Sequence, residues 1–337
     1  MDLKYLKSKA LSGESITKEE ALTIINYPDN RVEELLECSW DITRAYRGKI
    51  VDMCSIVNAK SAMCPEDCKF CAQSSIFKTN VKKYPLLPIE EVLQKAKEAY
   101  NKGATKFGIV ISARGPNDRE IEIICEMVKK IKEETDIEPD GSLGMLTEKQ
   151  AKKLKDSGMV TFNHNIETSK KHFPNICTTH TFEERIRTLN IVKEEGMKLC
   201  CGCIFGMGET REDRIDIAFT LREINPDIIP VNFLNPRQGT PLENLSIMPK
   251  IEAAKCIALM RFVNPEKQIK IAGGREIVFQ DNQEIIFKAG ADDIIVGDYL
   301  TTKGQPYEDD LKLIRKMGLE PKSDRIKKEG KFIGERK

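Results

Sequence analysis

The chain alternates between short apolar runs and amphipathic stretches. Apolar residues that recur every three or four positions predict helices, and short, mainly apolar runs between turn residues predict strands. Two short helices are expected within residues 15–47, with Thr17 as a cap of the first. Strands are then expected at residues 50–57, 106–112, 141–145, 159–163, 197–204, 227–233, 267–272 and 293–297. The intervening helices are expected at residues 88–102, 119–134, 147–157, 181–195, 211–225, 249–264 and 275–289.

Strands that alternate with helices in this way are typical of an α/β fold whose parallel strands close into a (β/α)8 barrel of the TIM type. A doubly wound open sheet is the alternative. Residues 1–48 are expected to form an N-terminal helical extension, residues 49–302 the barrel, and residues 303–337 a polar C-terminal tail that is solvated or disordered. In such a barrel the residues that do chemistry lie at the C-terminal ends of the strands.

Charge and hydropathy narrow the classes of function. The 337 residues include 54 basic and 53 acidic ones, and this balance argues against nucleic acid as a partner. No apolar run approaches the roughly 20 residues that span a bilayer, so no membrane partner is expected. The N-terminal sequence MDLKYLKSKALSGESITKEE lacks the apolar core of a signal peptide, which predicts a cytoplasmic protein. In a reducing compartment the 11 cysteines are expected to be metal ligands or reactive thiols rather than disulfides.

Three of these cysteines stand close together in the stretch SAMCPEDCKFCAQS, residues 61–74. Cys64, Cys68 and Cys71 have C-x3-C-x2-C spacing, so their thiolates can hold one corner of a compact cluster. A 4Fe–4S cluster has four irons, and three protein sulfurs leave one iron open. A zinc knuckle without its fourth ligand, or loop cysteines without a metal, are the alternatives. The triplet is the signature of the radical S-adenosylmethionine superfamily, in which the open iron chelates S-adenosylmethionine and one electron cleaves it to a 5′-deoxyadenosyl radical.

Polar residues recur where the predicted strands end. After the fourth strand, period-two alternation places Asn163 and Asn165 on one face, with Glu167 in register. Amides donate and accept hydrogen bonds, which suits a urea or a ribose, and a carboxylate can accept from ribose hydroxyls. The other candidates at this rim are Arg185, Asn232, Thr301 and Thr302. A solvated turn or surface is the alternative for each residue alone, but their convergence on one rim favours function.

A second group of cysteines belongs to the predicted strands. Cys200 and Cys203 form a C-x2-C pair in the fifth strand, with Cys201 between them, and such a pair is a metal signal in a reduced compartment. Cys54, in the first strand, is expected to point into the barrel by alternation. Cys177 stays ambiguous.

The amino-acid sequences of these segments and their surroundings are similar to those of the biotin synthase family. The resemblance rests on CPEDCKFCAQS, NHNIETS, GMGET, IPVNFLNPRQGTPL, AGGRE and GDYLTTKG, in this order and across nearly the whole chain. That family inserts sulfur between two unactivated carbons of dethiobiotin to give biotin. The resemblance implies that the cysteine triplet holds the 4Fe–4S cluster and that Asn165, Glu167 and Arg185 bind S-adenosylmethionine, with Arg185 on its carboxylate. It also implies an electron donor such as flavodoxin or ferredoxin, and a homodimer.

The same resemblance assigns the substrate contacts. Asn163 and Asn232 are expected to hold the ureido ring of dethiobiotin, and Thr301 and Thr302 its carboxylate tail. Glu167 stands where some members have aspartate, which is a conservative change.

One departure from the family concerns a second cluster. The best-known members hold a 2Fe–2S cluster inside the barrel with three cysteines and an arginine. Here only Cys200 of these four is kept, and Gly108, Asp140 and Lys270 stand at the other positions. The 2Fe–2S site therefore cannot be built as in the family.

We expect instead an auxiliary cluster of a 4Fe type, held by Cys54, Cys200 and Cys203, with Cys201 as a candidate fourth ligand. Strand alternation points Cys201 and Cys203 away from Cys200, so this set requires Gly202 to interrupt the strand. The alternative is that these are buried thiols and that the sulfur comes from elsewhere.

Three functions compete at this point. The first is that of the biotin synthase family. The second is another radical enzyme on the same barrel, such as a hydrogenase maturase or a mutase that makes a methylated amino acid, which needs neither a sulfur source nor the LTT segment as a carboxylate clamp. The third is an iron–sulfur carrier or scaffold without catalytic activity, against which the open iron and the asparagine-lined rim argue.

Overall fold

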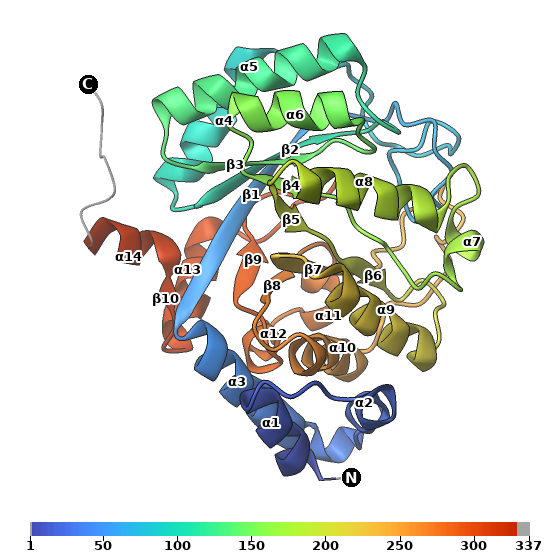
Figure 1. The fold of residues 1–337 in the computed structure, drawn as a ribbon, viewed down its shortest axis with the longest axis vertical. Helices are drawn as coiled ribbons and strands as arrows, with labels where there is room; N and C mark the ends of the chain where they lie inside the picture. The colour runs from blue at the N-terminus through green and yellow to red at the C-terminus, as the bar shows by residue number, and fades with distance from the viewer. Residues whose placement is uncertain (1, 329–337) are drawn as a thin grey trace.

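Parallel strands close into a barrel at the centre of the computed structural model, which describes residues 2–328 (Figure 1). The order around the barrel is β1-β2-β3-β4-β5-β7-β8-β9, and β6 pairs with β7. β1 also pairs with β9, with Asp52 opposite Asp293 and Cys54 opposite Ile295. This pairing closes the sheet, so the predicted TIM-type α/β barrel is confirmed and the open sheet is excluded. The strands are β1 Ile50–Lys60, β2 Lys106–Ile111, β3 Glu138–Ser142, β4 Thr161–Asn163, β5 Lys198–Cys200, β6 Cys203–Phe205, β7 Ile228–Phe233, β8 Gln268–Ile271, β9 Asp293–Ile295 and β10 Glu320–Pro321.

Helices surround the barrel, and several begin at a side-chain cap. The helices are α1 Leu3–Leu11, α2 Lys18–Ile25, α3 Val32–Arg47, α4 Ile89–Asn101, α5 Asp118–Glu134, α6 Glu148–Ser157, α7 Phe173–Ile176, α8 Phe182–Glu194, α9 Arg211–Ile224, α10 Lys250–Val263, α11 Arg275–Phe279, α12 Glu284–Lys288, α13 Tyr307–Lys316 and α14 Lys322–Lys328. Capping boxes start five of them, at Thr17, Asn117, Thr147, Thr181 and Thr210. In each box, side chains accept hydrogen bonds from backbone N–H groups that have no partner inside the helix. These bonds fix the residue at which the helix begins, next to the preceding loop.

The N-terminal extension has one helix more than predicted. α2 and α3 lie within the expected stretch, and α1 precedes them. α2 and α3 pack against α10 (Figure 1). α10 is buried along nearly its whole length, from Ala253 to Val263, because the barrel covers one side and the N-terminal helices cover the other. The extension therefore completes the core.

Two predicted elements are divided. The helix expected at residues 275–289 is broken into α11 and α12 near Gln280, whose φ of 47° is not helical. The strand expected at residues 197–204 is interrupted after Cys200 and resumes as β6 at Cys203.

The interpretation of the C-terminal region as a solvated or disordered tail is wrong for the part that the structure describes. α13, β10 and α14 follow the barrel, and β10 pairs with β1, with Ile50 opposite Glu320. Lys322 also reaches the buried Asp52 carboxylate at 2.9 Å. Residues 329–337 lie outside the described part. The division of the chain into an extension, a barrel and a tail stays an interpretation.

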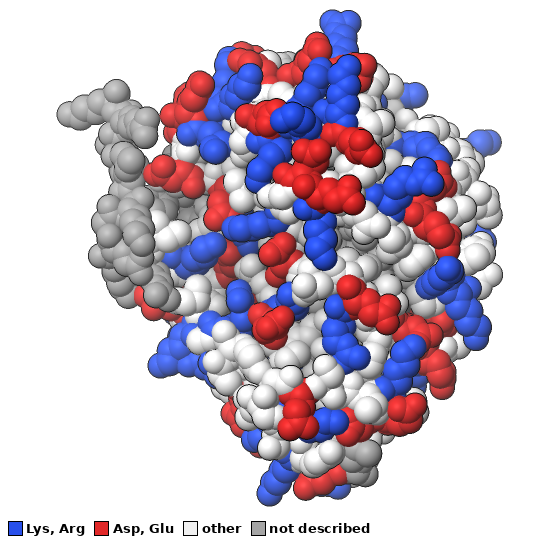
Figure 2. Space-filling view, viewed as in Figure 1, with Lys and Arg blue, Asp and Glu red and all other residues white. Residues whose placement is uncertain are grey.

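The surface carries both signs of charge in close alternation. Acidic and basic side chains are interleaved on the face shown in Figure 2, as the near-zero net charge leads us to expect. Within residues 2–328, none of the helices combines the length and the apolar character that a membrane span requires.

Candidate active site

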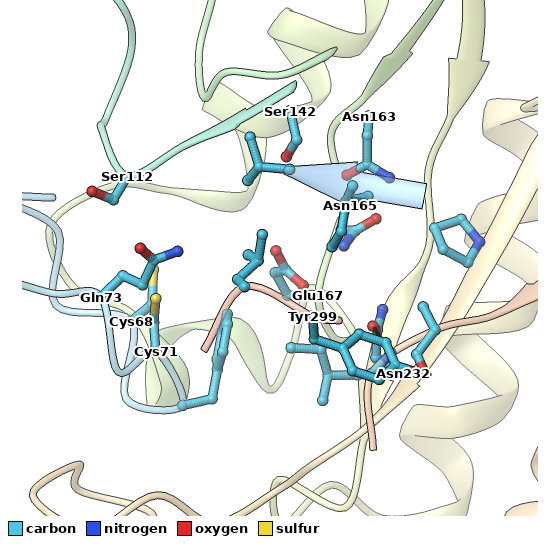
Figure 3. Close-up of a pocket in the computed structure, with 18 of the residues that line it drawn as sticks. Cys68, Cys71, Gln73, Ser112, Ser142, Asn163, Asn165, Glu167, Asn232 and Tyr299 are labelled. Carbon is cyan, nitrogen blue, oxygen red and sulfur yellow. Dashed lines mark hydrogen bonds between the residues drawn. The ribbon is translucent and has the colours of Figure 1, made fainter. Parts of the chain in front are cut away.

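A cavity of about 430 Å³ opens at the C-terminal ends of the barrel strands. This size suits a small-molecule site. Most of the side chains predicted for the site line it: Cys54, Cys64, Cys68, Cys71, Asn163, Asn165, Glu167, Arg185, Asn232, Thr301 and Thr302. Cys68 and Cys71 lie on one side of the cavity, and Asn163, Asn165 and Asn232 lie across from them (Figure 3). Segments far apart in the sequence thus meet at one rim.

The cysteine triplet is held by a tight loop after β1. The backbone N–H of Cys71 donates to the Cys68 carbonyl at 2.8 Å, and the N–H of Ser75 donates to the Cys64 carbonyl at 2.7 Å. All three thiols line the cavity, so three thiolate donors face one space, as an iron–sulfur cluster with one open iron needs. Burial raises the pKa of Cys71 to about 11 and also raises that of Cys64. Binding of iron must therefore displace thiol protons.

Cys177, left ambiguous by the sequence, lies behind this loop. Its Sγ is 3.7 Å from Cys68 Sγ and 3.2 Å from His180 Nδ1. Cys177 is not among the residues that line the cavity, whereas His180 is. Cys177 is thus a thiol neighbour of Cys68 that does not itself line the cavity.

A carboxylate ties the same loop to the segment before α8. Asp67 accepts hydrogen bonds from the backbone N–H groups of Thr178 at 2.9 Å and Thr179 at 3.1 Å. Burial alone would raise the pKa of Asp67, but a hydrogen bond from the Thr178 hydroxyl, together with these backbone bonds, holds it well below its usual range. Glu66 accepts from Arg114 Nη1 at 2.9 Å, which adds a second anchor. The loop is therefore braced before any cluster binds.

Glu167 and Arg185 form the charged part of the opposite wall. Arg185 Nη1 donates to the Asn165 carbonyl at 2.9 Å and lies 3.3 Å from Glu167 Oε1, and its Nε faces His180 Nε2 at 3.1 Å. Burial raises the pKa of Glu167, although the Arg185 guanidinium opposes this. Glu167 Oε2 is buried without a hydrogen-bond partner among the described residues. Its φ of 66° is also unusual for a residue with a side chain. An orphaned buried oxygen in a strained backbone indicates a ligand contact.

The asparagines on the strand ends are already oriented by the protein. Asn163 Nδ2 donates to Cys200 Sγ at 3.1 Å. Asn232 Nδ2 donates to the Cys203 carbonyl at 3.1 Å, and its Oδ1 accepts from the Gly273 N–H at 2.9 Å. An amide group has two donor hydrogens and two acceptor lone pairs, so each keeps capacity for a ligand. The protein therefore orients both amide groups and leaves each with hydrogen-bonding capacity for a ligand.

Thr301 and Thr302 lie in the loop after β9, which the backbone holds in place. Asn58 Nδ2 donates to the Leu300 carbonyl at 3.0 Å, and Tyr299 N–H donates to the Thr302 carbonyl at 2.9 Å. Both threonines line the cavity and remain partly exposed.

Among the other polar residues that line the cavity are two that were not predicted for the site. Gln73 and Tyr299 line it, and Figure 3 shows Gln73 beside the cysteines and Tyr299 near Asn232. Tyr299 O–H donates to the Ala272 carbonyl at 3.1 Å, and burial raises its pKa. Both residues stand inside segments that resemble the family, CAQS and GDYLTT, but nothing in their local spacing distinguishes them from their neighbours.

The predicted auxiliary-cluster ligands separate into two groups. Cys54 and Cys200 are buried inside the barrel, where burial raises their pKa values to about 12 and about 11. The Lys270 ammonium opposes this rise in the pKa of both thiols, and the Asp140 carboxylate adds to it. The inward orientation expected for Cys54 by strand alternation agrees with this placement.

Cys201 and Cys203 belong to the other group, so the set Cys54, Cys200 and Cys203 is not brought together. The strand is interrupted between Cys200 and Cys203, and only glycine fits at position 202, because a Cβ there would clash with the Pro230 carbonyl oxygen. The interruption does not turn Cys203 inward: its sulfur has Cys256 of α10 and Glu209 as neighbours, outside the barrel wall. Ile204 lines the cavity instead. Cys201 likewise packs in the apolar core, away from the cavity.

Known proteins are similar to this chain along most of its length. Residues 60–221 match the Radical SAM superfamily, and residues 230–320 match the Biotin and Thiamin Synthesis associated domain. The chain is 44% identical over 314 residues to a biotin synthase of Clostridium botulinum, covering 93% of this chain and 98% of that protein. It is 42% identical over 320 residues to one of Bacillus cytotoxicus, covering 95% and 96%.

Solved structures share the fold at lower identity. Methylornithine synthase superposes with a TM-score of 0.83 at 19% identity, covering 94% of this chain and 97% of that one. The FeFe-hydrogenase maturase from Carboxydothermus hydrogenoformans superposes with a TM-score of 0.79 at 16% identity, covering 95% and 79%. At these identities the likeness shows the barrel fold alone.

Proposed function

The chain belongs to the biotin synthase family, and from that membership we propose that it inserts sulfur into dethiobiotin to form biotin, using a 4Fe–4S cluster and S-adenosylmethionine. The observation that carries the proposal is one cavity with the cysteine triplet on one wall and the asparagines on the other. The 44% identity to a biotin synthase over 93% of the chain supports the same reaction.

The residues of the chain have separate tasks in this reaction. Cys64, Cys68 and Cys71 would hold the cluster, with one iron left open toward the cavity. When bound, such a cluster would supply one electron for the reductive cleavage of S-adenosylmethionine, which would give a radical able to abstract hydrogen from unactivated carbon. The other residues of the site would bind S-adenosylmethionine and dethiobiotin next to each other in the same cavity.

S-adenosylmethionine is expected to lie between the triplet and the Glu167–Arg185 pair. The Arg185 guanidinium carries the positive charge that pairs with a carboxylate, and it is buried beside Glu167 at 3.3 Å. The unpartnered Glu167 Oε2 can accept from ribose hydroxyls, as can the amide of Asn165. Binding would satisfy the buried oxygen that the protein leaves without a partner.

Dethiobiotin is expected to lie deeper along the same wall. Asn163 and Asn232, oriented by Cys200 and by the Cys203 carbonyl, offer an amide to each side of the neutral ureido ring. Thr301 and Thr302 would hold the carboxylate tail at the rim with their hydroxyls. Recognition of the ring therefore relies on hydrogen bonds and not on charge.

The family membership also leads us to propose the surroundings of the enzyme. Reduction of the cluster calls for a one-electron donor, such as flavodoxin or ferredoxin. We further propose a homodimer, a cytoplasmic location, and division of the chain into residues 1–48, 49–302 and 303–337.

The reaction can be tested directly. The protein is reconstituted anaerobically with iron and sulfide, reduced, and incubated with S-adenosylmethionine, with or without dethiobiotin. We expect dethiobiotin to stimulate formation of 5′-deoxyadenosine and biotin to accumulate. Cleavage of S-adenosylmethionine that dethiobiotin does not stimulate would reject dethiobiotin as substrate and favour another radical reaction.

Asn232→Ala is expected to weaken the binding of dethiobiotin. Losing one buried hydrogen-bond partner typically costs about 1–3 kcal/mol, which corresponds to a roughly 5- to 150-fold higher Kd. The affinity for S-adenosylmethionine should stay within about twofold, because Arg185 and Glu167 are unchanged. Calorimetric titration of the reconstituted protein with each ligand measures both constants. Equal loss of both affinities would show a general disturbance of the wall and contradict a ureido contact.

A further inference from the structure

Two cysteines from distant segments lie next to each other beside the cavity. Cys68 Sγ is 3.7 Å from Cys177 Sγ, across 109 residues of chain, and the two residues are only 8% and 3% exposed. Cys68 lines the cavity, whereas Cys177 does not. A small reactant that enters the cavity therefore meets Cys68 first, and Cys177 is a neighbouring sulfur that it cannot reach directly.

The backbone holds these two positions opposite each other through bonds that involve neither sulfur. The N–H of Lys69 donates to the Ile176 carbonyl at 3.0 Å, and the N–H of Thr178 donates to Asp67 Oδ1 at 2.9 Å. The residues before and after one cysteine are thus bonded to those around the other. A disulfide needs two segments held close in this way, because cysteines on distant backbones cannot be joined without backbone movement. Here a small rotation of the side chains brings the sulfurs into bonding distance.

A bound metal ion is the competing use of this group. Cys68, Cys177 and His180 place three potential ligand atoms within 4.8 Å of one another. The hydrogen bonds of His180 argue against a metal: Arg185 Nε donates to His180 Nε2 at 3.1 Å, and a guanidinium can only donate. The proton of a neutral His180 therefore lies on Nδ1, which faces Cys177 Sγ at 3.2 Å and the Glu66 carboxylate. Neither ring nitrogen keeps a free lone pair, so the group is better suited to chemistry between its two sulfurs.

We propose that Cys68 and Cys177 form a reversible disulfide when the cluster is lost and a peroxide enters the cavity. Hydrogen peroxide oxidises the Cys68 thiol to a sulfenic acid and releases one water. The Cys177 sulfur then attacks the Cys68 sulfur, so that the S–S bond forms, the S–O bond breaks, and the hydroxyl leaves with the Cys177 proton as a second water. Two electrons pass in total from the two thiols to the peroxide. A thiol reductant restores both thiols by disulfide exchange.

The disulfide protects a predicted ligand of the cluster. A sulfenic acid without a thiol nearby is oxidised further to a sulfinic acid, which thiol reductants do not restore. Cys177 is close enough to trap the sulfenic acid first, so Cys68 stays available for a new cluster. This role goes beyond the proposed function, and formation of the disulfide does not depend on which substrate the enzyme uses.

The disulfide can be detected in the unchanged chain. The full-length protein is freed of iron with a chelator under nitrogen, treated with hydrogen peroxide, alkylated, and digested without reduction. We expect mass spectrometry to find cross-linked peptides that carry Cys68 and Cys177, and dithiothreitol to restore both thiols together with the capacity to bind iron. Absence of a cross-link at Cys68, or cross-links that join it mainly to Cys64 or Cys71, overturns the proposal.

Variants show whether Cys177 protects Cys68. In Cys177→Ser the same treatment should give sulfinic acid at Cys68 and no disulfide, and the reduced protein should then have lost most of its capacity to bind iron. Cys38→Ser is the matched control, because Cys38 is also 8% exposed but lies in α3, and it should recover as the unchanged chain does. Equal recovery of Cys68 in Cys177→Ser and in the unchanged chain would show that Cys177 traps nothing. The cross-link in the unchanged chain remains decisive even if a variant does not fold.

The reconstituted protein gives a further readout. When it is exposed to peroxide, the disulfide should appear together with the release of iron, which a coloured chelator measures. A disulfide that forms in full while all the iron is retained would show that cluster and disulfide are not alternatives, and the proposal would be wrong. Zinc that binds the iron-free chain and is lost in Cys177→Ser would assign the group to a metal instead. None of these measurements uses dethiobiotin or S-adenosylmethionine, so they are independent of the proposed function.

Discussion

Replacing any one of Cys64, Cys68 and Cys71 with alanine is expected to abolish formation of 5′-deoxyadenosine. The three thiols line the same cavity, and among the described residues no further thiol beside them faces it from the cluster loop. Two thiolates cannot hold a cluster whose remaining iron must stay open for S-adenosylmethionine. Product is measured by chromatography after anaerobic reduction with S-adenosylmethionine, and should fall to the level of the iron-free protein.

Cys177 offers a sharp control for this prediction. Its sulfur lies 3.7 Å from Cys68 but behind the loop, so Cys177→Ser should keep most of the iron and of the S-adenosylmethionine cleavage. Full 5′-deoxyadenosine formation by Cys64→Ala, or complete loss in Cys177→Ser, would show that the ligands were assigned wrongly.

Arg275→Met is expected to destabilise the fold by about 3–5 kcal/mol. Arg275 Nη2 contacts both oxygens of Asp310, at 2.8 Å and 2.7 Å, and neither side chain is exposed. Removing one partner of a buried pair leaves the other charge without compensation, which costs this much in other proteins. The pair joins the start of α11 to α13, so the loss should also loosen the region after the barrel. Urea unfolding followed by circular dichroism measures the change.

A double variant tests whether the pair is the cause. Adding Asp310→Asn to Arg275→Met removes the uncompensated charge and should recover part of the stability. Arg315→Met is the control, because its partner Asp324 is partly exposed and such surface pairs contribute less than about 1 kcal/mol. Equal destabilisation by Arg275→Met and Arg315→Met would mean that burial of the pair does not matter.

Most of the predictions about the fold and the site came from the spacing of residues within single segments of the chain. The triplet lies within one loop, so its spacing alone indicates the cluster chemistry, whatever the rest of the chain does. The alternation of strands with helices predicted the barrel for a similar reason, since each element has a period that can be recognised in its own segment. The barrel then placed Asn163, Asn232 and the Thr301–Thr302 pair at one rim, because strand ends of a parallel barrel share one face.

Interruptions in a strand were harder to predict. Gly202 was expected to break the fifth strand, and it does, but the direction in which Cys203 emerges depends on how close Pro230 lies in β7. The sequence contains no local signal for that contact. The structure therefore places Cys203 in the apolar core and not with the other two thiols, while Cys54 and Cys200, in uninterrupted strand segments, lie inside the barrel as alternation predicts.

The sequence by itself determined the fold class, the cysteine triplet in one loop and the polar residues at the strand ends, because these depend on periods and spacings within single segments. The tertiary structure alone decided which distant side chains meet. Cys177 lies beside Cys68 across 109 residues, and Arg275 pairs with Asp310 across 35. Asp140 joins Cys54, Cys200 and Lys270 only because closure of the barrel brings alternate strands into one layer. Such meetings follow from strand register and barrel closure, which no single segment encodes.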